Sequence, residues 1–150
     1  MKLCFAASSG GHLEEIARLE KLKAGRESFL FTEEGLEESR FCEKVYYVKK
    51  IDRRERLFVL HFLGLFLRSW RVLRQERPDC VITTGALATY PISLLGKLSG
   101  CKLVYIESFA RANSASITGK LMHPIADLFI VQWEEGLRFF PKAVYGGGIF

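Results

Sequence analysis

The stretch that decides the fold is residues 1–22, MKLCFAASSGGHLEEIARLEKL. Residues 3–7 are small and apolar, as in a strand that is buried on both faces of a parallel sheet. A polar, glycine-rich turn follows over residues 8–12, and apolar residues then recur at helical spacing from Leu13 to Leu22. The pattern predicts a strand, a tight turn and a helix, which is the repeating unit of a parallel α/β sheet.

The turn between this strand and this helix is a candidate anion site. Gly10 and Gly11 allow unusual backbone angles and the close approach of a ligand, and the free amides of a helix N-terminus attract phosphates. A tight turn without a ligand explains the same residues and stays open as an alternative. A dinucleotide-dependent oxidoreductase fits poorly. The spacing G-x-G-x-x-G is missing, although Glu33 would supply the acidic residue after the second strand.

Composition and charge limit the remaining choices. The chain has 150 residues, 49% of them hydrophobic, which is enough for a single folded domain over residues 1–150. Its net charge of +5 is concentrated in residues 49–77, where nine Lys and Arg residues stand against three Asp and Glu residues. This local excess predicts an anionic partner. We expect no nucleic acid there, because the run between the basic residues is aliphatic and rich in Phe.

The four cysteines form no C-x-x-C pair, and three of them lie in or beside apolar, strand-like runs. They are Cys4, Cys42, Cys80 and Cys101. This arrangement is typical of buried free thiols in a cytosolic protein rather than of a metal site or a disulfide framework. We expect neither a metal nor a resident cofactor.

The rest of the chain alternates strands and helices. Apolar runs predict further strands at residues 28–32, 44–48, 79–83, 102–106 and 128–131. Helices are expected at 56–76, 87–98 and 116–124. Short connections between them predict right-handed parallel crossovers. The fold class is therefore α/β, a single Rossmann-like parallel sheet with flanking helices.

The helix expected at 56–76 is unusual because it shows no polar face over its first three turns. Such a helix is either fully buried or in contact with lipid, and so small a domain has little room to bury it. Its 11 apolar residues, 57–67, are too few for a transmembrane span, which needs about 20. We therefore favour a helix that lies in the plane of a membrane surface. A covering partner subunit, or a second copy of the chain, is the alternative.

The residues assigned to membrane contact combine apolar side chains, an interfacial Trp and flanking arginines. They are Arg56, Leu57, Phe58, Phe62, Leu63, Phe66, Leu67, Arg68, Trp70 and Arg71.

A second glycine turn, Thr84–Gly85, follows the strand at 79–83. In an open α/β sheet, ligands bind at the carboxyl ends of the strands, so this turn is expected to face the same crevice as residues 10–12. A plain turn between strand and helix remains the alternative. Glu107 stands at the end of the strand at 102–106, where a carboxylate serves as a general base, binds a substrate hydroxyl or caps the next helix.

Several separated motifs carry a family resemblance. They are S-G-G-H, T-G, Y-I-E-S-F-A-R, S-x-T-G-K-L and A-D-x-F-x-V-Q-W, in that order along nearly the whole chain. The chain resembles the membrane-anchoring, acceptor-side subunit of two-chain UDP-sugar glycosyltransferases. That family serves the dolichol pathway and, in bacteria, capsule and exopolysaccharide synthesis. The resemblance implies the N-terminal, acceptor-binding half of a GT-B enzyme.

The resemblance also implies roles for individual residues. The turn residues Ser9, Gly10 and Gly11 would contact the acceptor diphosphate, together with Thr84, Gly85, Ser108 and Arg111. His12 and Glu107 would be the catalytic pair, with either one as the base. A helix N-terminus lowers the pKa of a histidine, which favours the neutral form that a base needs. The tail residues Tyr145, Gly146, Ile149 and Phe150 would dock on the partner chain.

The partners implied are a separate donor-binding transferase subunit, a polyprenyl-diphosphate saccharide and an anionic membrane surface. The location implied is the cytoplasmic face of the cell membrane, and the UDP-sugar donor would be bound mainly by the partner. The alternative is a non-catalytic scaffold that only recruits and stabilises a transferase that is active alone.

Overall fold

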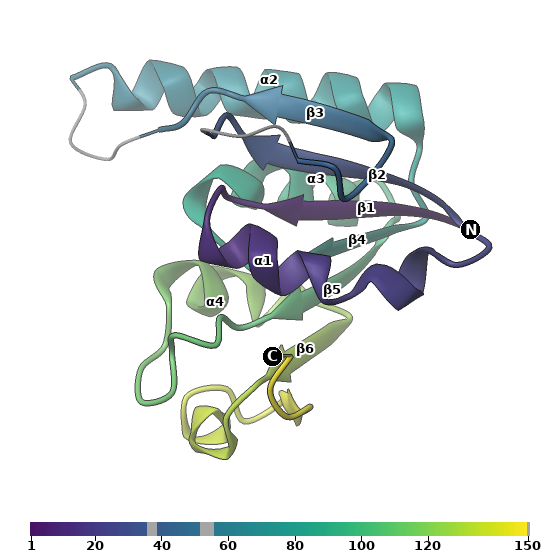
Figure 1. Ribbon diagram of the computed structural model, residues 1–150. Helices are drawn as coiled ribbons and strands as arrows, with labels where there is room; N and C mark the ends of the chain where they lie inside the picture. Colours follow the sequence, from purple (N-terminus) through teal and green to yellow (C-terminus); the bar gives the residue numbers. More distant parts are fainter. Residues whose placement is uncertain (36–38, 52–55, 150) are drawn as a thin grey trace.

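The computed structural model describes residues 1–35, 39–51 and 56–149. Within these residues one parallel sheet of seven strands runs in the order β3-β2-β1-β4-β5-β6-β7 (Figure 1). The strands are β1 (Lys2–Ala7), β2 (Glu27–Glu33), β3 (Lys44–Val48), β4 (Cys80–Thr83), β5 (Lys102–Ile106), β6 (Leu128–Val131) and β7 (Val144–Tyr145).

Four α-helices and three 3₁₀ turns connect the strands of the described chain. They are α1 (Gly11–Ala17), η1 (Glu20–Lys23), α2 (Phe58–Glu76), η2 (Leu87–Thr89), α3 (Tyr90–Leu98), α4 (Ile117–Met122) and η3 (Glu134–Arg138). Figure 1 shows α1 in front of the sheet and α2 and α3 behind it. The predicted α/β class with a single Rossmann-like sheet is confirmed.

Side chains of β1 show how the sheet is covered on both faces. Phe5 belongs to the core under α1, with Ile16 and Ile106. Cys4 points to the opposite core, under α2, α3 and α4, with Val72. Because successive residues of a strand face opposite sides, an unbroken apolar run fills both cores. All four cysteines are buried, as the sequence predicts.

The first helix is shorter than expected. The sequence pattern extends to Leu22, but α1 ends at Ala17, so the prediction of a continuous helix is wrong. The amide of Leu19 donates to the carbonyl of Ile16, three residues back, and the chain continues as the 3₁₀ turn η1. Leu22 is 41% exposed, so little apolar burial would be gained by prolonging the helix.

Helix α2 flanks the sheet with one face and leaves the other open. Leu65, Val72 and Leu73 are buried in the core, while Leu63 and Leu67 are exposed. The helix is thus neither fully buried nor free, because only one face of it packs against the domain. It ends at Glu76, before an αL residue and a proline, as predicted. None of the described helices is both long and apolar enough to cross a bilayer.

Candidate functional site

The carboxyl ends of β1 and β4 lie next to each other at the point where the strand order reverses. β1 pairs with β2 on one side and with β4 on the other. The chain leaves β1 toward α1, on one face, and leaves β4 toward α3, on the other (Figure 1). In open α/β sheets, ligands bind beside loops that diverge in this way.

The loop after β1 presents its backbone to this crevice. Gly10 and Gly11 are exposed, and Gly10 has a φ of 85°, which disfavours any other residue there. The Gly10 carbonyl accepts hydrogen bonds from the amides of Leu13 (2.9 Å) and Glu14 (3.2 Å), which starts α1. Ser9 is half-buried beside them. Three of the predicted diphosphate contacts, Ser9, Gly10 and Gly11, therefore share one tight turn, although α1 has only seven residues.

The two glycine turns are joined directly. The Thr84 hydroxyl donates to the backbone carbonyl of His12 over 3.0 Å, across 72 residues of sequence. The two turns therefore adjoin, as expected, and a shared ligand-binding crevice between them stays a prediction.

The surroundings of His12 lower the pKa of its imidazole. Burial lowers the pKa of His12, and the positive charge of Arg111 lowers it further, while the Thr84 backbone and the charge of Glu33 oppose the shift. The buried Nδ1 atom has no hydrogen-bond partner within the described part of the chain. A lowered pKa favours the uncharged imidazole that a general base needs.

The loop after β4 holds unusual backbone conformations. Gly85 has a φ of 94°, and a side chain there would come within 2.6 Å of the Tyr105 hydroxyl. Ala86 has a φ of 88° and a ψ of 155°, a region that is otherwise almost restricted to glycine. Hydrogen bonds fix this shape, because Thr89 donates to the carbonyls of Gly85 (2.9 Å) and Ala86 (3.0 Å). Strain of this kind clusters at functional sites.

Glu107 lies at the end of β5 but faces inward. It is 3% exposed, and its carboxylate accepts hydrogen bonds from the Ser116 hydroxyl (3.0 Å) and the Ser108 amide (3.3 Å). Gly119 packs so closely that a Cβ there would lie 2.0 Å from the carboxylate. Burial raises the pKa of Glu107, while Ser116 and Ser108 oppose the shift. Both oxygens are thus engaged beneath the start of α4.

Arg111 and Ser108 lie in the loop between β5 and α4. Arg111 is exposed and donates to the Ser114 hydroxyl over 3.3 Å. Its charge lowers the pKa values of both His12 and Glu107, so Arg111 stands within electrostatic reach of both predicted catalytic residues.

Two buried acids were not among the predicted site residues. Glu15 is 3% exposed and Glu33 is 8% exposed. Burial raises the pKa of each, and hydrogen bonds partly oppose the shift. Glu33 ends β2 and acts on His12 through its charge. Glu15 stands beside Glu14 in the sequence, and a charged pair on an amphipathic helix usually indicates a solvated face. The position of Glu15 in the sequence therefore did not indicate that its side chain is buried.

The C-terminal residues follow the edge of the sheet. The Gly146 amide donates to the Val131 carbonyl (3.0 Å), and the Ile149 amide donates to the Gln132 side chain (2.9 Å). Ile149 is half-buried against its own domain, whereas Tyr145 is 51% exposed. Phe150, the fourth residue predicted to bind the partner, lies outside the described residues.

The residues predicted to contact a membrane divide into two groups. Leu57, Leu63, Leu67 and Trp70 are between 44% and 58% exposed, and the three arginines of the set are exposed as well. The three phenylalanines are half-buried. Phe58 stacks on Phe62, and Phe62 meets Phe66 edge to face. The Phe62 and Phe66 ring centroids each lie 6.4 Å from that of Tyr90 in α3.

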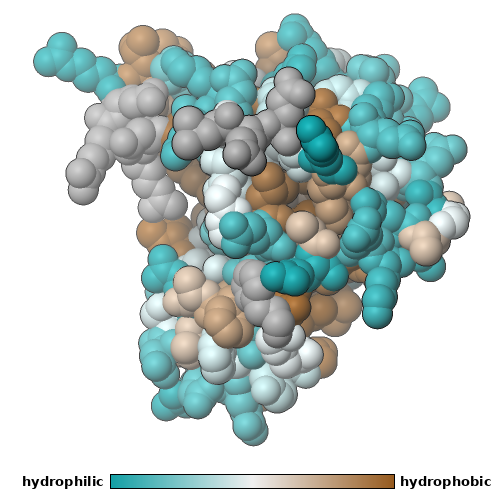
Figure 2. Space-filling model, viewed as in Figure 1, coloured by the Kyte–Doolittle hydropathy of each residue, from teal (hydrophilic) through white to brown (hydrophobic). Residues whose placement is uncertain are grey.

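Val59 and Leu60 complete the exposed stripe on α2, at 65% and 62% exposure. We call Val59, Leu60, Leu63, Leu67 and Trp70 the apolar stripe. Arg74 lies over the Trp70 ring, 4.9 Å from its centroid. Both hydrophobic and hydrophilic residues show along the upper rim of the molecule, where α2 lies (Figure 2). An apolar stripe bordered by arginines is typical of a helix that binds a membrane surface with anionic lipids.

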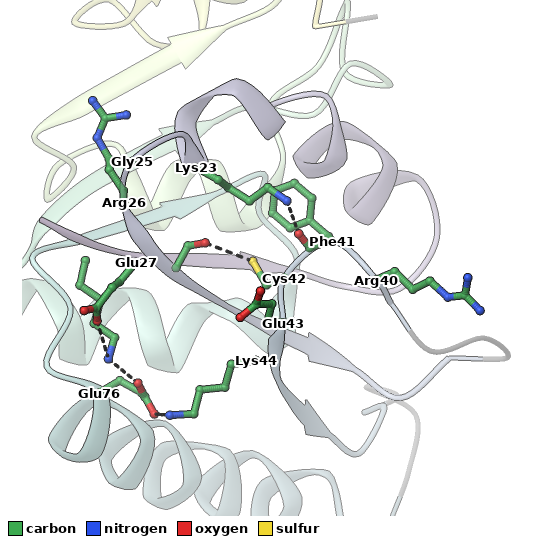
Figure 3. A pocket seen from close by; sticks show the side chains of 12 residues that line it. Lys23, Gly25, Arg26, Glu27, Arg40, Phe41, Cys42, Glu43, Lys44 and Glu76 are labelled. Carbon is green, nitrogen blue, oxygen red and sulfur yellow. Dashed lines mark hydrogen bonds and ion pairs between the residues drawn. The ribbon is translucent and has the colours of Figure 1, made fainter.

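A large hollow, of about 790 Å³, lies at the other end of the sheet. Figure 3 shows the starts of β2 and β3 and the end of α2 around it. Glu76 is buried there and pairs with Lys2 (2.6 Å) and Lys44, and it accepts a hydrogen bond from the Tyr46 hydroxyl. The Glu76 carboxylate is thus fully engaged by side chains of its own domain.

Comparison with known proteins places the chain. A family model described as "Oligosaccharide biosynthesis protein Alg14 like" matches residues 43–149. The chain belongs to this family. The resemblance found in the motifs is therefore confirmed.

Two curated relatives illustrate the range of similarity. The human "UDP-N-acetylglucosamine transferase subunit ALG14" is 28% identical over 183 residues, covering 99% of this chain and 83% of that protein. The protein of the same name from Kluyveromyces lactis is 46% identical over 68 residues, covering 45% of this chain. That match spans only 28% of the Kluyveromyces protein.

Solved structures agree on the fold. Acinetobacter baumannii MurG superposes with a TM-score of 0.69 at 18% identity, over 87% of this chain and 40% of that one. The UDP complex of S. aureus MnaA superposes with a TM-score of 0.73 at 16% identity, and the match covers 99% of this chain and 44% of that one. The galactosyltransferase WaaB superposes with a TM-score of 0.65 at 14% identity, and the match covers 97% of this chain and 43% of that one. The chain thus spans less than half of each, which confirms a fold equivalent to one half of a GT-B enzyme.

Proposed function

We propose that this chain is the acceptor-side subunit of a heteromeric UDP-sugar glycosyltransferase. It binds a polyprenyl-diphosphate-linked saccharide at the cytoplasmic face of the membrane and recruits a separate chain that binds the UDP-sugar. The process is synthesis of a lipid-linked oligosaccharide or of a capsular or exopolysaccharide. The observation that carries the proposal is the family match, together with the His12–Thr84 junction of two glycine turns in one crevice.

The size of the chain supports a two-chain enzyme. Curated relatives are named as subunits of a UDP-N-acetylglucosamine transferase, and the GT-B chains with a similar fold are more than twice as long as the matched part. A GT-B enzyme binds its acceptor and its nucleotide sugar on two Rossmann-like domains. This chain supplies one such domain, and a partner would supply the other.

The crevice has groups suited to the chemistry. In the transfer, a hydroxyl of the acceptor forms a bond to the anomeric carbon of the sugar, UDP leaves with the bonding electron pair, and a base takes the hydroxyl proton. His12, whose pKa is lowered by burial, suits the base better than Glu107, because both carboxylate oxygens of Glu107 are already bonded. Arg111 and the exposed backbone at Gly10 and Gly11 suit the diphosphate.

The apolar stripe on α2 suits the membrane. A monotopic helix buries its apolar face at the boundary between head groups and acyl chains, and each arginine near an anionic surface adds about 1 kcal/mol. The local positive charge of residues 49–77 is of the right sign for that surface. An acceptor carried by a polyprenyl chain would then reach the crevice without leaving the bilayer.

Reconstitution tests the proposal. This chain and the chain that co-purifies with it from membranes are assayed separately and mixed. The assay uses radiolabelled UDP-N-acetylglucosamine, UDP-galactose or UDP-glucuronate and a set of polyprenyl-diphosphate saccharides in vesicles. We expect transfer only by the mixture. Transfer by this chain alone overturns the proposal. Full kcat from the other chain alone, with only KM changed on mixing, favours the scaffold alternative.

Vesicle flotation tests the membrane contact separately. Replacing two leucines of the apolar stripe, Leu63→Ser with Leu67→Ser, is expected to weaken binding to vesicles that contain anionic phospholipids by about tenfold or more. The matched control replaces two exposed leucines elsewhere, Leu98→Ser with Leu121→Ser, which are 74% and 48% exposed. Equal losses in the two double variants would argue against α2 as the membrane surface.

A further inference from the structure

Glu15 joins two parts of the crevice that lie far apart in sequence. One of its carboxylate oxygens, Oε1, accepts hydrogen bonds from the Ser108 hydroxyl (3.1 Å) and the Phe109 backbone amide (2.9 Å). These bonds cross 93 and 94 residues and connect α1 to the loop after β5. They are direct contacts between the helix that carries His12 and the loop that carries Arg111.

Such a carboxylate is expensive to bury. Glu15 is 3% exposed, and its second oxygen, Oε2, is buried without a hydrogen bond of good geometry in the described part of the chain, although the Gln132 side chain lies close enough to lower the pKa of Glu15. An uncompensated buried oxygen destabilises the fold, and an apolar side chain would pack there at lower cost. The adjacent Glu14 is exposed. Stability therefore does not explain an acid at position 15, whereas a need for a specific acceptor atom does.

The position of Glu15 links it to the predicted base. His12 and Glu15 are three residues apart on one short helix, so both side chains lie on the same face. By holding Phe109, Glu15 fixes the loop at the point from which Arg111 acts on the His12 imidazole. The loop is gripped from its other side as well, because the Trp133 indole donates to the Phe109 carbonyl over 2.6 Å.

We propose that Glu15 is a positioning residue of the acceptor site. It sets the Ser108–Arg111 loop against α1, so that Arg111 and His12 face the same acceptor diphosphate. This inference rests on the proposed function, because it assigns Glu15 to the acceptor side of the transfer. Glu15 acts through the loop and does not touch the acceptor, since its oxygens are buried.

The experiment compares three variants of the full chain. Glu15→Ala removes both hydrogen-bond acceptors, Glu15→Gln keeps one oxygen able to accept at Oε1, and Glu14→Ala is the control at the exposed neighbouring position. In the reconstituted pair, Glu15→Ala is expected to raise the KM for the polyprenyl-diphosphate acceptor about tenfold. The KM for the UDP-sugar is expected to stay within twofold. Glu15→Gln is expected to recover most of the loss, and Glu14→Ala to show none.

A second readout needs no activity. Hydrogen exchange of the Phe109 amide in the isolated chain is expected to accelerate in Glu15→Ala and to remain slow in Glu14→Ala. If Glu15→Ala does not fold, Ser108→Ala removes one donor of the same network and is judged by the Phe109 exchange alone, because Ser108 is itself a predicted contact of the acceptor.

The outcomes separate the two proposals. Unchanged exchange at Phe109, or equal increases in the KM values of acceptor and donor, would overturn the positioning role. Absence of transfer in the unmodified pair would overturn the proposed function, while the exchange measurement would still decide whether Glu15 holds the loop.

Discussion

The two ends of the sheet treat buried charge in opposite ways. At the amino end, the Glu76 carboxylate is surrounded by Lys2, Lys44 and Tyr46. At the carboxyl end, His12 and Glu15 each keep a buried polar atom without a hydrogen-bond partner in the described chain. A matched ion cluster stabilises a fold, whereas unused polar atoms cost stability and are kept where chemistry needs them. The comparison separates a structural end from a functional end.

The pKa shifts show the same contrast. Burial raises the pKa of Glu76, but hydrogen bonds from Lys2, Lys44 and Tyr46 outweigh it and lower that pKa to about 2. At the other end burial prevails, raising the pKa values of Glu15, Glu33 and Glu107 and lowering that of His12. The uncharged form is favoured wherever partners are too few, which is how enzymes tune acids and bases.

The largest expected effect is at His12. His12→Ala removes the proposed base, and we expect the transfer rate of the reconstituted pair to fall by about 10² to 10⁴. The melting temperature is expected to stay close to that of the unmodified chain, because the imidazole leaves a nitrogen unbonded. Rate and melting temperature are measured on the same preparation. Transfer within twofold of the unmodified pair would remove His12 from the chemistry.

The complementary variant is Glu76→Ala, at the structural end. It leaves two lysines and a tyrosine without their shared partner, so we expect a loss of about 2–3 kcal/mol in the free energy of unfolding. Urea denaturation measures it. The control is Glu27→Ala, because Glu27 also approaches Lys2 (3.7 Å) but its side chain is 81% exposed. If Glu76→Ala also lowers the kcat of the reconstituted pair by tenfold or more, the amino end of the sheet does more than stabilise the fold.

Acid titration sharpens the same contrast. Glu76 has a folded-state pKa of about 2, below its usual value, so its contribution is present above about pH 4.5 and is lost as the pH falls toward 2. The difference in unfolding free energy between the unmodified chain and Glu76→Gln is therefore expected to shrink over that range. A difference that stays constant down to pH 2 would show that the carboxylate charge is not what Glu76 contributes.

A smaller effect is expected at Ala86. Its backbone lies in a region that costs a residue other than glycine about 1–3 kcal/mol, and the extra freedom of glycine in the unfolded chain costs about 0.5–1 kcal/mol. Ala86→Gly is therefore expected to stabilise the chain by about 1 kcal/mol while lowering activity, because the loop after β4 loses rigidity. Thermal unfolding and the transfer assay measure the two effects. Destabilisation would show that the backbone at Ala86 is unstrained.

The sequence predicts the elements that have strong periodicity. The strands at 44–48, 102–106 and 128–131 match to the residue, because each is a short apolar run bounded by polar or turn residues. The strand β7 was missed, since two residues, Val144 and Tyr145, are too few to show a pattern. The end of α1 was misplaced because apolar spacing continues into a 3₁₀ turn.

The parts of the site that follow from a local sequence motif could be predicted. Glycine turns at the ends of strands indicate a crevice, so His12 and Thr84 were expected together and are joined by a hydrogen bond. Burial of single polar residues was not predictable, because it depends on loops from distant parts of the chain. Glu15 looks like a solvated helix residue until the loop at 108–109 closes over it, and Glu107 looks accessible until Ser116 and Gly119 cover it.

The smallest expected effect concerns Arg111 and the pH profile of the reconstituted pair. Because the base must be neutral and burial lowers the pKa of His12, the acid limb of kcat/KM is expected below pH 6.5. The positive charge of Arg111 contributes to that lowering, so Arg111→Ala is expected to move the acid limb to higher pH, in addition to weakening acceptor binding. Arg111→Lys keeps the charge and is expected to leave the limb in place. If all three profiles coincide, His12 is not the group whose protonation limits the rate, and the functional end must hold another base.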